Sequence, residues 1–318
     1  MRIYFDTNVY SMVVARGEVA AMRAFLNSAK CSVLASTRNL IESFAIPDIE
    51  KRHVESGAIG KIASAFEDRP SAFKHARELR LEIGRLRPKW LRVTASQSSI
   101  RRYLRGHQSA WQKCRDQQVP TSADFAAYRR DAEGGIERVR EGQKAERSAK
   151  RDALRLMLAS ESSGGGALSL HSEIDLKDPE KFWRADALTS WHAAIVERAP
   201  ASRDYFDYLG PYLKDNAFGD RASYLSFWLN EVDAGRLARN RLTSLVSFFQ
   251  LDSRSTHGNP GDAIHANHLL DVDLFVTADK AFAKSLDQVR SLVPGAAVVK
   301  LIDRSRASAV AEIAQALE

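Results

Sequence analysis

The sequence predicts an α/β protein whose parallel sheet is flanked by helices and interrupted by a large, mostly helical insertion. Short apolar strands alternate with helical segments in the first 48 residues, and the same alternation returns near the C-terminus. This alternation is typical of parallel sheets. Between the two ends lie about two hundred residues with few strand signals. We therefore predict one discontinuous α/β domain, 1–48 plus 242–318, and a helical insertion at 49–241.

The N-terminal part contains two predicted strands and two predicted helices. RIYF, which precedes Asp6, is a short apolar strand, and CSVLAS (31–36) is a second one. The apolar spacing of VAAMRAFLNSA (19–29) predicts a helix between them. Thr37 is suited to cap the next helix, which carries Glu42.

The C-terminal part repeats this order. GDAIHANHLLDVD predicts a helix that begins near Asp262, and LFVTAD (274–279) predicts a buried strand. KAFAKSLDQV, AAVVKLI and ASAVAEIAQAL then predict a helix, a last strand and a closing helix. The two ends of the chain thus have the pattern of two parts of one sheet.

The middle of the chain is charged and mainly helical, in two blocks at roughly 50–160 and 175–250. LRVTAS (91–96) is its best strand candidate, and SSGGGALS (162–169) is a flexible break. The aromatic cluster at 205–228 indicates core packing or a partner surface more than a cofactor site.

Composition favours a globular protein that binds a polyanion. Apolar residues make up 44% of the chain, and the net charge is +7 with a pI near 9.4. A basic balance favours nucleic acid as a partner. Two cysteines give neither a disulfide framework nor a metal-binding spacing. Without a signal peptide or a run long enough to span a membrane, a cytoplasmic protein is expected.

Four acids are placed where a parallel sheet forms its sites. Asp6 and Asp279 end strands, Glu42 lies on the helix after the second strand, and Asp262 opens a later helix. Sites in open parallel sheets form outside the carboxyl ends of the strands. Each acid also has a plainer interpretation: Asp262 and Asp279 could cap helices, and Glu42 could be solvated.

Together the four acids predict a metal site. Two carboxylates about 4 Å apart repel by roughly 4 kcal/mol at an effective dielectric near 20. A crevice with four of them requires cations or shared protons. Oxygen ligands suit Mg²⁺ or Mn²⁺ better than zinc.

The stretches FDTN, LIES, GDAIHANHLL and LFVTADKAF resemble the acidic motifs of the PIN-domain ribonuclease family. The resemblance aligns Asp6, Glu42, Asp262 and Asp279 with that family's catalytic and metal-binding acids. It aligns Asn8 and Thr277 with supporting polar residues. It implies a nuclease that uses a divalent metal, usually on RNA, built on a parallel sheet of strand order 3-2-1-4-5.

The resemblance also bears on partners. Many bacterial members of that family are toxins held by an antitoxin, so it raises a toxin role with an inhibitor protein as partner. More than two hundred residues separate Glu42 from Asp262, a departure from the family's usual spacing.

Two other functions stay open at this point. One is a PIN-like module that binds RNA or protein without cleaving. The other is a phosphatase with Asp6 as nucleophile, although that chemistry usually uses a second Asp where Asn8 stands.

The segment 69–115 is a candidate nucleic-acid interface. It has thirteen Lys and Arg against two Glu, with aromatic residues interleaved. Such a composition suits single-stranded nucleic acid, because basic side chains can bind the phosphates and aromatic rings can stack on the bases. The candidate contacts are Arg85, Arg87, Lys89, Trp90 and Arg92. The alternative is an amphipathic helix pair with Leu and Trp in the core.

No histidine is predicted to act as a general base. His257, His265 and His268 lie near Asp262. They could reach a substrate, but surface or packing roles on the helix are favoured.

Overall fold

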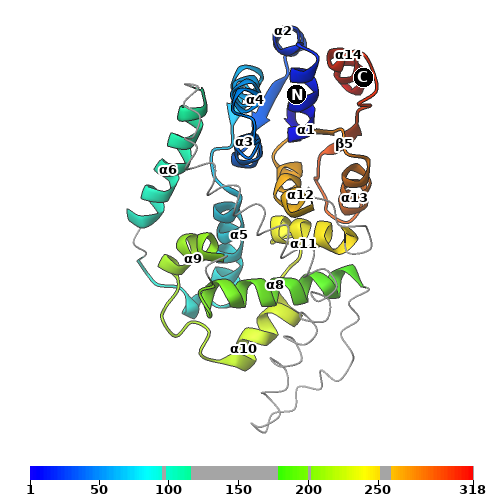
Figure 1. The fold of residues 1–318 in the computed structure, drawn as a ribbon. Coiled ribbons are helices and arrows are strands. Elements are labelled where there is room, and N and C mark those ends of the chain that lie inside the picture. The colour runs from blue at the N-terminus through cyan, green and yellow to red at the C-terminus, as the bar shows by residue number, and fades with distance from the viewer. Residues whose placement is uncertain (95–97, 116–177, 200–201, 251–258, 318) are drawn as a thin grey trace. The chain divides into compact units, whose positions relative to one another are not determined.

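The computed structural model describes residues 1–94, 98–115, 178–199, 202–250 and 259–317 (Figure 1). The chain divides into two compact units. The first unit, called the α/β unit below, includes residues 1–70 and the C-terminal segment from His257. The second, called the helical unit, includes 71–94 and the described residues from 178 to 250. The units alternate along the chain, and one boundary between them, after Arg101, falls within α6 (Ser98–Arg115).

The α/β unit contains a five-stranded parallel sheet of order β3-β2-β1-β4-β5. The prediction of an α/β protein with strand order 3-2-1-4-5 is confirmed. The strands are β1 (Arg2–Phe5), β2 (Ser32–Ala35), β3 (Ala65–Phe66), β4 (Leu274–Thr277) and β5 (Val298–Leu301).

From Ile3 to Phe5 the central strand β1 is buried on both faces, which is why these residues form an apolar run. Ile3 lies beside Val33 on one side and beside Leu274 on the other. Ile3 and Phe5 belong to the core under one face of the sheet. The Tyr4 ring packs against Phe275, with ring centroids 5.1 Å apart.

Helices cover both faces of this sheet (Figure 1). The Ile3 face packs against helices that contact one another, α1 (Thr7–Ala15), α2 (Val19–Ser28), α4 (Ile49–Ile62) and α14 (Ala309–Leu317). The Tyr4 face meets α13 (Lys280–Arg290) through Phe275 and Phe282, and the 3₁₀ helix η5 (Asn267–Leu270) through His268. Also in this unit are α3 (Thr37–Phe44) and α12 (Asn259–Ala266).

Three features of this unit differ from the sequence expectations. Helix α1 begins directly after β1 and was not predicted, because its residues have no clear polar face. The α3 N-cap is Ser36, not Thr37, since the Ser36 side chain accepts the Asn39 N–H in a capping box. The predicted boundary at residue 48 falls inside the unit, because α4 leads into β3, which pairs with β2.

The helical unit is built from α5 (Ser71–Leu86), η1 (Pro88–Trp90), α8 (Pro179–Ile195), α9 (Arg203–Leu209), η3 (Gly210–Tyr212), α10 (Arg221–Ser226), the π-helix η4 (Phe227–Glu231) and α11 (Ala238–Gln250). Over the described part of the predicted strand at 91–96, residues 91–94, no strand forms. Leu91 makes only an isolated antiparallel bridge to Leu213, and 95–97 lie outside the described residues. From the 205–228 cluster, Tyr224, Phe227 and Trp228 are buried in the core.

The predicted break at 162–169 lies outside the described residues. Within the ranges described, no helix combines the length and the apolar character that a membrane span requires.

Candidate functional site

Asp6 is held at the carboxyl end of β1 by hydrogen bonds to both of its carboxylate oxygens. It caps α1, because Oδ1 accepts the Thr7 N–H at 2.7 Å. Oδ2 accepts from Asn8 Nδ2 at 2.5 Å and from Thr277 Oγ1 at 2.7 Å. Asp6 is only 6% exposed. A carboxylate that ends a buried strand is therefore oriented by the backbone turn and by two neighbouring polar side chains.

Asn8 and Thr277 join the ends of β1 and β4. Besides its bond to Asp6, Asn8 accepts the Ala278 N–H through Oδ1 at 2.9 Å. The fully buried Thr277 hydroxyl also accepts the Asp279 N–H at 3.0 Å. These contacts set the spacing between the ends of two adjacent strands, from which Asp6 and Asp279 extend.

Glu42 approaches Asp6 from α3 and is held by two cationic or polar partners. Its Oε1 accepts from Arg38 Nε, one helical turn earlier, at 2.7 Å. Its Oε2 lies 3.0 Å from His265 Nε2.

His265 occupies the centre of the acidic group. Its side chain is 1% exposed, and its Nε2 lies 3.6 Å from Asp6 Oδ1 as well as beside Glu42. Its Nδ1 shares a hydrogen bond of 2.6 Å with the Tyr4 hydroxyl, which also bonds Ser36 Oγ at 2.7 Å. The sequence analysis favoured a surface or packing role for His265 and did not predict that it contacts the acids. The available signal was the spacing of three residues between Asp262 and His265, which puts both on one face of a helix.

Gly261 allows this approach of α12 to α3. A Cβ at Gly261 would collide with the guanidinium of Arg38 and with Oε1 of Glu42. A side chain at this position would therefore have to displace the ends of Arg38 and Glu42.

Asp262 and Asp279 complete the set of predicted acids. Asp262 lies in the first turn of α12 and is half-buried. Asp279 caps α13, where its Oδ1 accepts the N–H groups of Ala281 and Phe282 at 2.8 and 2.9 Å. Both bonds use one oxygen, so Oδ2 of Asp279 has no hydrogen-bond partner among the described residues. The plainer interpretation of Asp279 as a helix cap thus holds, and it leaves one oxygen for another contact.

The pKa shifts show that these groups act on one another. The pKa of Asp262 is raised to about 7, mainly by burial and also by the charges of Asp6, Asp279 and Glu42, while His265 opposes them. Burial also raises the pKa of Asp6, against the attraction of His265. The four acids therefore form one electrostatic group.

The ion pair of Glu42 and His265 shifts both partners. Burial opposes the charge of Glu42, but the imidazolium of His265 and then Arg38 hold the pKa of Glu42 well below its usual range. Burial likewise disfavours the imidazolium, and the carboxylates of Glu42 and Asp6 outweigh it, so the pKa of His265 is raised. A proton on His265 compensates part of the negative charge.

Asp6, Glu42 and His265 can hold a metal ion. One ligand atom from each lies within 4.8 Å of the others. Carboxylate oxygens with one imidazole nitrogen form a donor set that divalent metals accept. The predicted acids Asp262 and Asp279 are not in this closest group; Asp262 interacts electrostatically with all three of its members and with Asp279.

The other histidines have different surroundings. His268 is buried and stacks on Tyr4 with ring centroids 4.4 Å apart. Its Nδ1 lies 3.2 Å from Asp271 Oδ2. It has the packing role that was favoured for it. His257 lies outside the described residues.

In the helical unit, most of the candidate nucleic-acid contacts are engaged within the unit. Arg85 pairs with Glu82, Arg87 pairs with Glu231, and Arg92 pairs with Asp215. Trp90 is 8% exposed and packs against Phe218 and Phe227. Its ring is in the core, so the structure does not support a base-stacking role for Trp90. Lys89 is exposed.

Comparison of this chain with protein-family models, with curated proteins and with solved structures finds no match.

Proposed function

We propose that the α/β unit is a divalent-metal-dependent endoribonuclease of the PIN-like kind. The observation that carries the proposal is the meeting of Asp6, Glu42 and His265 at the carboxyl edge of the parallel sheet. Asp262 interacts electrostatically with this group, and Asp279 with Asp262. The strand order and the acids together are what the sequence motifs predict.

The donor set fits Mg²⁺ or Mn²⁺. Carboxylate oxygens dominate it, which suits hard divalent cations, and no cysteine takes part among the described residues. The raised pKa values of Asp6 and Asp262 show that the group holds more negative charge than burial tolerates. A cation removes this cost. Asp6, Glu42, Asp262 and Asp279 are the residues that would hold it, with His265 beside them.

When bound, a divalent ion would supply an activated water and neutralise charge on the phosphate under attack. The chain positions the groups for this. Asn8 and Thr277 fix both the position and the orientation of Asp6. Arg38 and His265 hold Glu42 ionised, so it is ready to accept a cation.

The phosphatase alternative is disfavoured by the residue two positions after Asp6. That chemistry usually uses a second Asp there, and this chain has Asn8. Asn8 and Thr277 instead donate to Oδ2 of Asp6, and Oδ1 accepts the Thr7 N–H. These bonds fix the orientation of the carboxylate, as a metal ligand requires. A toxin role with an inhibitor protein as partner remains the expectation that the motif resemblance raised.

The test is cleavage by the purified full-length protein. Labelled transfer RNA, messenger RNA and single-stranded DNA are incubated with Mg²⁺, with Mn²⁺ and with EDTA. The proposal predicts internal cleavage of RNA that requires a divalent ion and is lost in Asp6→Asn. Absence of cleavage with either metal, while RNA is still bound, would favour the non-catalytic module. A stable aspartyl-phosphate would favour the phosphatase.

A further inference from the structure

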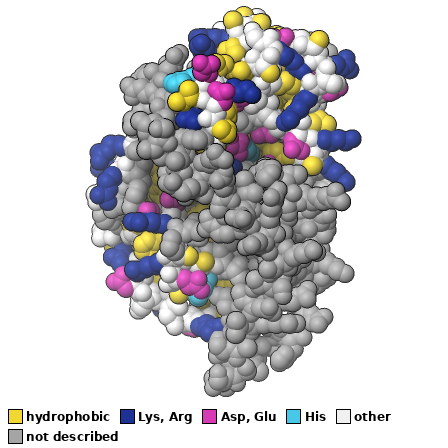
Figure 2. Space-filling view, viewed as in Figure 1, with side chains coloured by type: hydrophobic (Ala, Val, Ile, Leu, Met, Phe, Trp, Pro, Cys, Tyr) yellow, Lys and Arg dark blue, Asp and Glu magenta, His cyan; other side chains and the backbone are white. Residues whose placement is uncertain are grey.

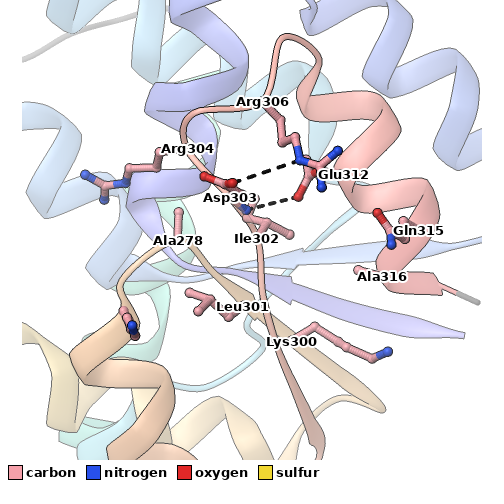
Figure 3. Close-up of a pocket in the computed structure, with 11 residues that line it drawn as sticks. Ala278, Lys300, Leu301, Ile302, Asp303, Arg304, Arg306, Glu312, Gln315 and Ala316 are labelled. Carbon is pink, nitrogen blue, oxygen red and sulfur yellow. Dashed lines mark hydrogen bonds and ion pairs between the residues drawn. The ribbon is translucent and has the colours of Figure 1, made fainter.

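An open pocket of about 660 Å³ lies at the carboxyl end of β5 (Figure 3). Its walls come from the turn after β4 and the first residue of α13, from β5 and the loop after it, and from α14. The proposed metal ligands do not line it, so it is distinct from the acidic group.

The pocket has an excess of positive charge that its own acids do not neutralise. Arg306 faces Glu312 at 3.5 Å and Asp303 at 4.0 Å. Figure 3 shows Lys300 and Arg304 pointing away from these acids. No carboxylate among the described residues lies within ion-pair distance of Lys280, Lys300 or Arg304. Three cations of the pocket are thus available to an anion.

The pocket adjoins the proposed catalytic edge. β4 and β5 are parallel neighbours, so their carboxyl ends lie at the same edge of the sheet. The lining residues Ala278 and Lys280 flank Asp279 in the sequence, and Asn8 accepts the Ala278 N–H. A chain of phosphates that passes the acidic group can therefore reach the pocket.

A surface view agrees with this distribution. Figure 2 shows Lys and Arg side chains on the outer surface of the α/β unit, on the side of β5, α13 and α14 in the view of Figure 1. Leu301, which also lines the pocket, is 48% exposed. An apolar side chain among cations suits a ligand with both phosphates and less polar sugar or base surfaces.

We propose that this pocket binds backbone phosphates of the nucleic-acid strand on one side of the bond to be cleaved. Lys280, Lys300 and Arg304 make the contacts. The inference rests on the proposed nuclease function, because it assigns the substrate's path from the same edge of the sheet. It requires a substrate that extends beyond the scissile phosphate. It also implies which part of the strand is held: the bound phosphates lie on the β5 side of the acids.

The test compares two triple variants that remove equal charge. The pocket variant carries Lys280→Gln, Lys300→Gln and Arg304→Gln. The control carries Arg23→Gln, Lys30→Gln and Lys61→Gln. These three residues are exposed, and Lys30 and Lys61 lie near the amino ends of β2 and β3. Circular dichroism melting checks that both variants fold. A third protein with Lys280→Arg, Lys300→Arg and Arg304→Lys keeps the charge.

Binding of a fluorescent RNA of roughly 12 nucleotides, on the order of single-strand site sizes, is measured in EDTA at several salt concentrations. Each lost phosphate contact reduces the slope of log K against log salt by about 0.7. The pocket variant should therefore lose about 2 from this slope and bind more weakly. The control and the charge-preserving protein should retain the wild-type slope.

Equal slopes for the pocket variant and the control would overturn the inference. The inference would also be overturned if uridine monophosphate displaced the RNA and bound with the same affinity as the RNA, because the pocket would then hold one isolated phosphate. Cleavage with Mn²⁺ is measured separately on wild type. Cleavage with an unchanged slope refutes the pocket alone, and a changed slope without cleavage refutes the nuclease alone.

Discussion

Glu42 and His265 are 223 positions apart in the sequence, yet Oε2 of Glu42 lies 3.0 Å from Nε2 of His265. The other ring nitrogen of His265 is bonded to the Tyr4 hydroxyl at 2.6 Å. Burial raises the pKa of Tyr4 well above its usual range, so this hydroxyl stays protonated. The tyrosine of the central strand therefore sets the direction in which His265 faces the acids. Residues that orient a metal-binding histidine in this way are important for metal affinity.

Tyr4→Phe tests this relationship. The change keeps the ring that packs on Phe275 and His268 but removes the bonds to His265 and Ser36. We expect Mn²⁺ affinity to fall about tenfold, the lower end of the usual effect of such partners. Stability should fall by about 1 kcal/mol. Isothermal titration calorimetry with Mn²⁺ measures the first effect, and urea unfolding in EDTA the second.

Tyr10→Phe is the matched control, because Tyr10 is as buried as Tyr4 and lies in the core under the opposite face of the sheet. It should leave Mn²⁺ affinity within about twofold of wild type, a change of roughly 0.4 kcal/mol. If both variants lose affinity equally, Tyr4 acts on general stability and does not position His265.

The sheet could be predicted from the sequence because each of its main strands is recognisable from its own residues. RIYF, CSVLAS and LFVT are buried on both faces, so each is a continuous apolar run bounded by polar residues. The strand at LRVTAS was predicted on the same kind of signal, and its described residues, 91–94, form no strand. There, Arg92 is engaged with the Leu213 carbonyl and Asp215 in a helical unit, which local propensity cannot foresee.

The site was predicted only in part, for a related reason. Asp6 and Asp279 could be placed because each lies within two residues of the end of a strand. His265 could not, because its role depends on Tyr4 and Glu42, which reach it from distant segments. The packing of Gly261 against Arg38 is likewise visible only once α3 and α12 lie together. Contacts between segments that are separated by a long insertion produce no repeating pattern in the sequence from which they could be predicted.

Gly261→Ala should damage the site without a change in any ligand. The new methyl group would displace the Arg38 guanidinium and Glu42 Oε1. We expect Mn²⁺ affinity to fall by tenfold or more and RNA cleavage to fall with it, because misplaced ligands lose affinity steeply. Fluorescence-detected melting with and without Mn²⁺ measures the loss.

Gly57→Ala is the control for this glycine. Gly57 lies inside α4, where a Cβ would meet nothing within 4 Å. Alanine there should stabilise the protein by roughly 0.5–1 kcal/mol, since it favours the helix. It should leave metal binding unchanged. An equal loss of Mn²⁺ affinity in both variants would refute the close-approach argument.

The pKa of Asp262 predicts how the metal-free protein depends on pH. Folding raises this pKa from 3.8 to about 7. The folded state therefore favours the protonated acid, and that stability is complete below about pH 4 and lost as pH rises to about 7. About three pK units correspond to about 4 kcal/mol, and the partial exposure of Asp262 reduces this to roughly 1–3 kcal/mol.

Asp262→Asn removes this titration. In EDTA, the variant should gain stability relative to wild type as pH rises from 4 to 8, and urea unfolding at each pH measures the difference. Asp273→Asn, an exposed acid at the amino end of β4, serves as the control. A constant difference between Asp262→Asn and wild type across this range would contradict the raised pKa.

The helical unit offers a test of the Trp90 assignment. Trp90 is packed against Phe218, Phe227 and Tyr224. Trp90→Ala should destabilise the protein by about 3–5 kcal/mol, as large aromatic deletions in cores do. Trp90→Phe keeps most of the packing and should leave RNA affinity unchanged. Loss of RNA affinity in a folded Trp90→Phe protein would restore the stacking role.

Asp6→Asn separates a ligand from a structural acid, because the two roles predict opposite effects on stability. The amide removes a charge that burial disfavours and Glu42 repels, and this outweighs the attraction of His265, since the pKa of Asp6 is raised. It also removes one acceptor from the bonds to Thr7, Asn8 and Thr277, which costs about 1 kcal/mol. We expect these effects to offset, so that the metal-free variant is as stable as wild type or more stable. Asp6→Ala, which loses the whole helix cap, should be less stable by about 1–2 kcal/mol.

Metal should then distinguish the proteins. Mn²⁺ at about one hundred times its dissociation constant adds roughly 2.7 kcal/mol to the stability of wild type. Asp6→Asn should gain much less and should not cleave RNA. Melting in EDTA and in Mn²⁺, together with a cleavage assay, gives both results from one preparation. If Asp6→Asn is destabilised by several kcal/mol in EDTA and its folded fraction still cleaves, Asp6 is a structural acid. Its hydrogen bonds to Asn8 and Thr277 would then serve only to join β1 to β4.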